Sequence, residues 1–189
     1  MIEGLDASGK STQAHLLASF LLSKGKTVCL RIHPSSDNVY GSITKRFLKA
    51  DGSIAHFGSA IFYMLDVVRS ILKYSGKDYD YLLFVRYLLG TVYLPTPIDK
   101  IAYQFFSALV PTPAITFFID TKTEIALQRI AKRPQNMLEI FEKIGSLREI
   151  RSKGLIMASF AKWHILNGNR SAQEIECEIR NEIKGIQVI

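Results

Sequence analysis

The first residues that could do chemistry lie at the start of the chain, in the stretch GLDASGKS. Residues 4–11 fit the pattern G-x-x-x-x-G-K-[ST], in which backbone N–H groups surround phosphate oxygens. Gly4 and Gly9 permit the close approach of the backbone, Lys10 neutralises β and γ oxygens, and the Ser11 hydroxyl is a ligand for Mg²⁺. The pattern therefore predicts a site for phosphate and Mg²⁺. Its predicted binding residues are Gly4, Leu5, Asp6, Ala7, Ser8, Gly9, Lys10, Ser11 and Thr12.

Such a loop normally follows a buried strand and opens a helix. Only the residues MIE precede it, so we expect either an unusually short strand or a natural chain that begins upstream of Met1. The stretch STQAHLLASFLLSKGK then has apolar residues at helical spacing and stops at Gly25. We therefore expect a helix from Lys10 to about Lys24, whose N-terminus faces any bound phosphate.

The rest of the chain alternates between strand-like and helix-like segments. Runs rich in β-branched and aromatic residues predict strands at 27–32, 81–85, 115–120 and 162–166. Apolar residues at helical spacing predict helices near 57–74, 100–109, 123–133, 138–160 and 171–184. This alternation predicts an α/β protein with a three-layer P-loop NTPase fold, in which helices flank a parallel sheet. Ligands of such sheets bind at the carboxyl ends of the strands.

The composition is that of one folded domain over residues 1–189, with 48% hydrophobic and 22% charged residues. No run of about 18 apolar residues occurs, and the N-terminus enters a charged loop, so we expect a cytoplasmic protein without a membrane segment. Cys29 and Cys177 have neither the number nor the spacing of a disulfide framework or zinc site. The net charge of +7 comes from scattered Lys and Arg residues, so we attribute it to small anionic ligands or solubility, not to nucleic acid.

The loop and its flanks, EGLDASGKSTQ, resemble the thymidylate kinases, a family of nucleoside monophosphate kinases whose loop reads E-G-x-[DE]-x-x-G-K-[ST]-T-Q. The family's strand followed by R-E-P resembles the stretch TVCLRIHPSSDNVYG, and its D-R-[YH] motif resembles FVRYLLGTVY. Its pattern strand-Asp-x-x-x-E-x-A-x-x-R-I resembles ITFFIDTKTEIALQRI. EIFEKIGSLREIRSKG is similar to the helix after its lid, and WHILNGNRSAQEIECEI to its last strand, adenine loop and helix. The resemblance implies transfer of the γ-phosphoryl group of ATP, with Mg²⁺, to a deoxynucleoside monophosphate, with dTMP favoured. It also implies a homodimer.

The resemblance implies roles for two residues at the acceptor. Asp6 would hold the ribose 3′-hydroxyl, since a carboxylate accepts the hydrogen bond of that hydroxyl. Arg86 would bind the acceptor phosphate, because a guanidinium stays charged and can hold phosphate oxygens in bidentate fashion. The alternatives are an Asp favoured by the dipole of the following helix and a solvated cation at a strand end.

Further acceptor residues follow from the same resemblance. Arg69 falls where the family has an arginine for the base or phosphate. Leu65 occupies the position of its stacking aromatic, with Phe62 and Tyr63 nearby. Lys45 or Arg46 resembles its phosphate-binding cation after R-E-P, and Tyr93 lies one place from a tyrosine that contacts the deoxyribose. A surface cation and a core tyrosine are the alternatives for the last two positions.

The reaction also needs an arginine beside the transferred phosphoryl group, to offset its charge. Some thymidylate kinases carry it in the phosphate loop and others in a lid. The loop here has none, so we assign the role to a short lid at about 132–139, with Arg133 as the catalytic cation and Arg129 nearer the adenine. Asn169 and Arg170 would border the adenine. The alternative for the two lid cations is a helix C-terminus, whose dipole favours positive charge.

Two carboxylates of the family pattern are missing. Val85 stands in place of the Asp of D-R-[YH], and His33 in place of the Glu of R-E-P. The first normally helps to organise Mg²⁺, so its loss predicts low activity. One alternative is therefore a weak or inactive nucleotide-binding relative. Because Arg69, Leu65 and Tyr93 do not fix the base, the other alternative is a kinase for another nucleotide or a nucleoside. The resemblance makes Asp120 a structural residue at the end of its strand.

Overall fold

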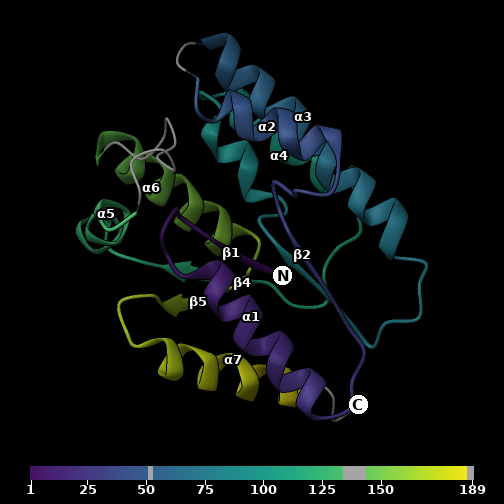
Figure 1. The fold of residues 1–189 in the computed structure, drawn as a ribbon. Helices are drawn as coiled ribbons and strands as arrows, with labels where there is room; N and C mark the ends of the chain where they lie inside the picture. Colours follow the sequence, from purple (N-terminus) through teal and green to yellow (C-terminus); the bar gives the residue numbers. More distant parts are fainter. Residues whose placement is uncertain (51–52, 134–143, 187–189) are drawn as a thin grey trace.

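Five parallel strands form one sheet in the computed structural model of the chain, which describes residues 1–50, 53–133 and 144–186 (Figure 1). From one edge to the other the order is β2-β3-β1-β4-β5, and all neighbouring pairs are parallel. The strands are β1 (Ile2–Gly4), β2 (Val28–Ile32), β3 (Tyr81–Val85), β4 (Phe117–Asp120) and β5 (His164–Asn167). The predicted parallel sheet is therefore confirmed, with every predicted strand present.

Helices cover both faces of the sheet (Figure 1). On one face α1 and α7 lie side by side, and Leu17 and Ile179 pack there against Phe117. On the other face α3, α4 and α6 enclose cores that include Phe84 and Phe118. The helices are α1 (Lys10–Ser23), α2 (Val39–Phe47), α3 (Ser53–Tyr74), the 3₁₀ helix η1 (Leu89–Tyr93), α4 (Ile98–Leu109), α5 (Thr123–Ala131), α6 (Ile144–Phe160) and α7 (Ala172–Ile186).

The strand before the phosphate loop is only three residues long, but it occupies the centre of the sheet. Ile2 is paired with Val85 of β3 on one side and with Phe117 of β4 on the other. The Arg86 N–H donates to the Ile2 carbonyl at 3.2 Å, and the Phe117 N–H donates to the Met1 carbonyl at 2.9 Å. Neighbours on both sides therefore fix β1, and the loop follows it directly.

The helices differ from the prediction mainly at their ends. α3 and α4 begin at Ser53 and Ile98, a few residues before their predicted starts. α2 and η1 are not among the predicted elements. α2 depends on a polar cap, in which the Asn38 side chain accepts from the Gly41 N–H at 3.0 Å, and apolar spacing does not reveal such a cap.

Residues 138–143 of one predicted helix, and most of the predicted lid, lie outside the described residues. Within the described residues, no helix is long and apolar enough to span a membrane.

The core between α1 and the sheet makes a prediction about stability. Leu17 is 1% exposed and Leu22, on the same helix, is 57% exposed. We expect Leu17→Ala to lower the free energy of unfolding by about 2–5 kcal/mol, because it removes buried methyl groups and leaves a cavity. Leu22→Ala should change it by less than about 0.5 kcal/mol. Urea unfolding measures both; equal effects would contradict this placement of α1.

Candidate active site

The phosphate loop has a conformation that its glycines allow. Gly4 has a φ of 145° and Gly9 a φ of 98°, values that other residues rarely adopt. A Cβ on residue 4 would lie 2.7 Å from the Ile119 carbonyl oxygen, so a side chain would also collide with β4. The Lys10 ammonium donates to the Leu5 carbonyl at 2.5 Å. The loop thus folds over the N-terminus of α1, where free N–H groups attract phosphate.

A cavity of about 410 Å³ opens above this loop. Four arginines contribute to its wall, namely Arg86, Arg129, Arg133 and Arg170. Together with Lys10 at the start of α1, they make this a site for a polyanion. The predicted phosphate-binding residues 7–12 line the cavity, and so does the unpredicted Gln13. Leu5 instead packs in the core beneath the loop.

Arg129 connects the phosphate loop to the loop that follows β5. Its guanidinium donates to the Ala7 carbonyl at 3.2 Å and to the Gly168 carbonyl at 3.1 Å. Asn169 and Arg170 belong to this second loop, and Arg170 lies in the wall of the large cavity. Arg129 therefore links the phosphate loop to the loop that carries Asn169 and Arg170, the other two residues that the sequence assigns to the adenine side.

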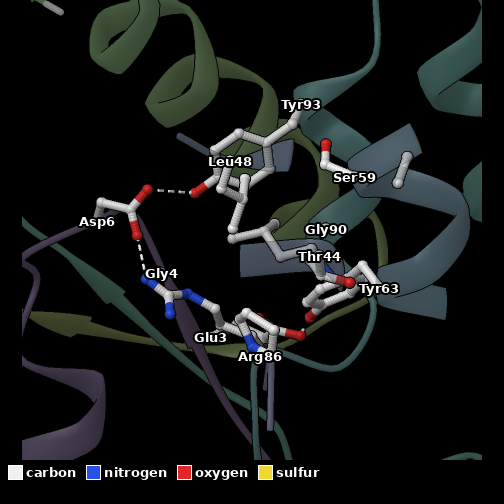
Figure 2. A pocket seen from close by; sticks show the side chains of 13 residues that line it. Glu3, Gly4, Asp6, Thr44, Leu48, Ser59, Tyr63, Arg86, Gly90 and Tyr93 are labelled. Carbon is white, nitrogen blue, oxygen red and sulfur yellow. Dashed lines mark hydrogen bonds and ion pairs between the residues drawn. The ribbon is translucent and has the colours of Figure 1, made fainter. Parts of the chain in front are cut away.

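The buried Asp6 and the partly exposed Arg86 form an ion pair on the other side of the loop (Figure 2). The Asp6 carboxylate is 1% exposed, and it accepts hydrogen bonds from the Arg86 guanidinium and, at 2.9 Å, from the Tyr93 hydroxyl. Burial acts to raise the pKa of Asp6, but the charges of Arg86 and Lys10 and these hydrogen bonds lower it to about 2. The structure therefore brings three predicted acceptor residues into contact; the Tyr93 ring packs against the core, and its hydroxyl reaches Asp6.

A second cavity, of about 40 Å³, lies beside this ion pair (Figure 2). Its lining residues are Glu3, Gly4, Asp6, Pro34, Thr44, Leu48, Ser59, Ala60, Tyr63, Arg86, Leu89, Gly90 and Tyr93. Such a volume holds about one ordered water, so it must widen to admit a nucleotide. Among the described residues, neither Glu3 Oε2 nor the Tyr63 hydroxyl has a hydrogen-bond partner. The wall of this cavity therefore offers unused polar groups.

The remaining predicted acceptor residues do not line either cavity. Leu65 is 42% exposed, Arg69 forms an ion pair with Asp37 at 3.7 Å, and Lys45 donates to a serine hydroxyl of the preceding loop. The aromatic residue of α3 that lines the smaller cavity is Tyr63. On a helix, residues two positions apart face different directions, which separates Tyr63 from Leu65. Any contact of Leu65, Arg69 or Lys45 with an acceptor stays a prediction.

Val85, His33 and Asp120, which lie at strand ends, differ in their burial and contacts. Val85 is fully buried in the core between the sheet and α1. His33 is also buried, with its ring stacked on Phe84 at 5.4 Å between centroids, and burial lowers its pKa to about 4. It is therefore neutral at pH 7 and offers no charge to a phosphate. Asp120 accepts from the Arg151 guanidinium at 2.6 and 2.8 Å, an ion pair suited to a structural role.

Three polar residues near the site are absent from the predicted set: Glu3, Tyr63 and Asp66. Asp66 is fully buried, and it accepts from the Ser35 N–H at 2.6 Å and from the Asn38 amide at 2.7 Å. It thereby ties α3 to the segment that follows β2. The signal that could have revealed these residues is a polar side chain inside an apolar run, such as MIEG or IFYMLDVVRSIL.

The lowered pKa of Asp6 makes stability depend on pH. A carboxylate with a pKa of about 2 in the folded state, against 3.8 normally, stabilises the fold above about pH 4 and loses this effect as pH falls through 2. Asp6→Asn should remove on the order of 2 kcal/mol at pH 7 and flatten the loss of stability between pH 4 and 2. Unfolding measured across this range, with the exposed Asp78→Asn as control, tests it. Parallel pH curves for Asp6→Asn and the unmodified chain would contradict it.

Comparisons with known proteins agree with this geometry. The sequence model of the thymidylate kinase family matches residues 2–179. A probable thymidylate kinase of Metallosphaera sedula is 27% identical over 176 residues, which are 93% of this chain and 86% of that protein. The thymidylate kinase of Thermosipho africanus is 26% identical, covering 96% and 95%. The structure of thymidylate kinase from Candida albicans has the same fold, with a TM-score of 0.75, 18% identity, and coverage of 98% and 90%. The chain therefore belongs to the thymidylate kinase family of nucleoside monophosphate kinases.

Proposed function

We propose that the chain transfers the γ-phosphoryl group of ATP to dTMP, forming ADP and dTDP in the cytoplasm. Family membership supports the reaction class, and the names of the relatives favour dTMP as the acceptor. The observation that carries the proposal is the position of Arg86, which lines both the cavity above the phosphate loop and the cavity beside Asp6. A donor phosphate in the first cavity and an acceptor phosphate in the second would meet at this guanidinium.

On the donor side, the loop N–H groups and Lys10 would hold the β and γ phosphates of ATP. The Ser11 hydroxyl lies in the wall of the large cavity. It would hold Mg²⁺ together with the phosphate oxygens of ATP, a donor set that suits a hard cation. When bound, Mg²⁺ would neutralise charge on those phosphates. Val85 adds no carboxylate at the end of β3, so we expect slow turnover.

On the acceptor side, binding would reorganise the Asp6–Arg86 pair. A monophosphate carries more negative charge than one carboxylate, so it would take over hydrogen bonds of the Arg86 guanidinium. Asp6 could then accept the hydrogen bond of the 3′-hydroxyl, with the Tyr93 hydroxyl still beside it. The Tyr63 ring, in the wall of the smaller cavity, would contact the base once that cavity widens.

During transfer, charge spreads over the oxygens of the moving phosphoryl group. Lys10 and Arg86 would stabilise it from the loop and from the end of β3, and Arg133 from the lid side of the large cavity. Arg129 is held by two backbone carbonyls, so it would support the adenine side. Positioning and electrostatics suffice for this chemistry, and no covalent nucleophile is needed.

We also propose a homodimer, and no nucleic-acid partner. α3 exposes Phe57, Ile61 and Leu65, which are spaced four residues apart and form one apolar stripe. A second copy that packs against this stripe would remove it from water. Sedimentation equilibrium should show a dimer, and Ile61→Glu should convert it into a monomer. A monomer at every concentration would contradict this assignment.

The proposed reaction is tested by ADP release from Mg·ATP with a panel of acceptors: dTMP, dUMP, other monophosphates and thymidine. We expect dTMP to stimulate release most. Lys10→Ala should lower the rate at least about 100-fold, since it removes a charge that neutralises the transferred group. The matched control is the exposed Lys24→Ala, at the end of α1, which should keep full activity.

Other outcomes of this panel would revise the proposal in defined ways. Stimulation by a different monophosphate or by thymidine would change the acceptor but keep the kinase. ATP binding without stimulation by any acceptor would indicate a nucleotide-binding relative. Full turnover by Lys10→Ala would contradict the mechanism itself.

A further inference from the structure

Glu3 is a fully buried carboxylate to which the proposed chemistry gives no role. On β1, successive side chains point to opposite faces of the sheet. Ile2 packs in the core with α1 and α7, whereas Glu3 lies on the other face, in the wall of the smaller cavity (Figure 2). A carboxylate at such a position is costly unless it is hydrogen-bonded. Among the described residues Oε2 has no partner, so the contacts of Oε1 indicate the role of Glu3.

One oxygen of Glu3 holds three consecutive backbone amides. Glu3 Oε1 accepts from the N–H groups of Tyr87 at 2.7 Å, Leu88 at 2.8 Å and Leu89 at 3.2 Å. Burial raises the pKa of Glu3, and these three bonds act to lower it. The amides lie at the start of the 3₁₀ helix η1, where N–H groups lack partners within the helix and a negative charge is favourable. Glu3 therefore caps η1 from a different strand.

The capped segment connects two residues of the acceptor site. Arg86 directly precedes the three amides, and its φ of 58° is in the left-handed region, which a residue with a side chain adopts only when its neighbours enforce it. Tyr93 ends η1 on the other side of the cap and donates to Asp6. One carboxylate, located one residue before the phosphate loop, thus holds the first three amides of the segment between Arg86 and Tyr93, whose apolar side chains also pack in the core.

We propose that Glu3 is a positioning residue for the acceptor: by capping η1 it holds Arg86 and Tyr93 against Asp6, and it links their position to that of the phosphate loop. This inference rests on the proposed function for its kinetic consequence, but its structural part stands without it. Loss of the cap should move the Arg86 guanidinium, and a displacement of about 1 Å near reacting groups can lower rates roughly 100-fold.

Steady-state kinetics with Glu3→Gln and Glu3→Leu test the proposal. Gln keeps an uncharged oxygen acceptor of the same size, whereas Leu has none, so the effect should grow from Gln to Leu. We expect kcat/KM for the acceptor to fall roughly 10-fold in Glu3→Gln and about 100-fold or more in Glu3→Leu, with KM for ATP changed less than about twofold. The matched control is Asp99→Asn, a buried carboxylate that accepts from the Lys100 N–H in the first turn of α4 and lines neither cavity.

A merely structural role for Glu3 predicts a different pattern. The KM values for ATP and acceptor would then move together, in proportion to the loss of thermal stability, and Asp99→Asn would show the same relation. That result would overturn the proposal. Equal kinetics for Glu3→Leu and the unmodified chain would overturn it too.

Two measurements distinguish failure of this proposal from failure of the proposed function. If the unmodified chain binds ATP but phosphorylates no acceptor, the proposed function fails. The positioning role of Glu3 is then tested by structural measurements and not by kinetics. Hydrogen exchange should then show the amides of residues 87–89 protected in the unmodified chain and less protected in Glu3→Leu, which has no oxygen acceptor, with α1 unchanged. A crystal structure of Glu3→Leu should show Arg86 displaced from Asp6, and an unmoved Arg86 would overturn the positioning role. Unprotected amides in the unmodified chain would overturn it even if Glu3→Leu fails to fold.

Discussion

The ion pair between the buried Asp6 and the partly exposed Arg86 is the interaction around which the site is organised. A carboxylate that is 1% exposed cannot stay charged without partners, because burial disfavours the ionised form. Arg86 and Tyr93 supply those partners from the end of β3 and from η1, while Asp6 itself belongs to the phosphate loop. The pair therefore joins the donor loop to the acceptor side. It also separates the two cavities, with Arg86 in the wall of both.

A strand of three residues can carry this site because of its place in the sheet. β1 lies between β3 and β4, and hydrogen bonds to Arg86 and Phe117 fix it from both sides. Because successive side chains of β1 point to opposite faces of the sheet, Ile2 and Glu3 have different roles. Ile2 anchors the strand in the core beneath α1, and Glu3 holds the start of η1 on the opposite face. Gly4 begins the loop where the backbone passes too close to β4 for any side chain.

Much of this arrangement is predictable from sequence, because it depends on local patterns. The phosphate loop has a fixed spacing of glycines, lysine and serine, and the buried strands are short runs of apolar residues. The parallel direction of the strands then places their carboxyl ends at one edge, where Asp6 and Arg86 follow β1 and β3. By contrast, α3 has apolar residues on its exposed side, such as Ile61 and Leu65, as well as on its buried side, so apolar spacing does not show which side faces the site. The prediction named Leu65 from the position of the family's aromatic, and the structure places the neighbouring Tyr63 in the cavity wall. The cap by Glu3 joins residues more than 80 positions apart, which no local pattern reveals.

The most direct test of the central claim is to follow the terminal phosphate of ATP. With γ-³²P-labelled ATP, Mg²⁺ and dTMP, phosphoryl transfer across Arg86 predicts that the label appears in dTDP, in equal amount to the ADP formed. Release of the label as inorganic phosphate at the same rate with and without dTMP would contradict a shared donor and acceptor site, and so would the absence of any transfer despite binding of both nucleotides.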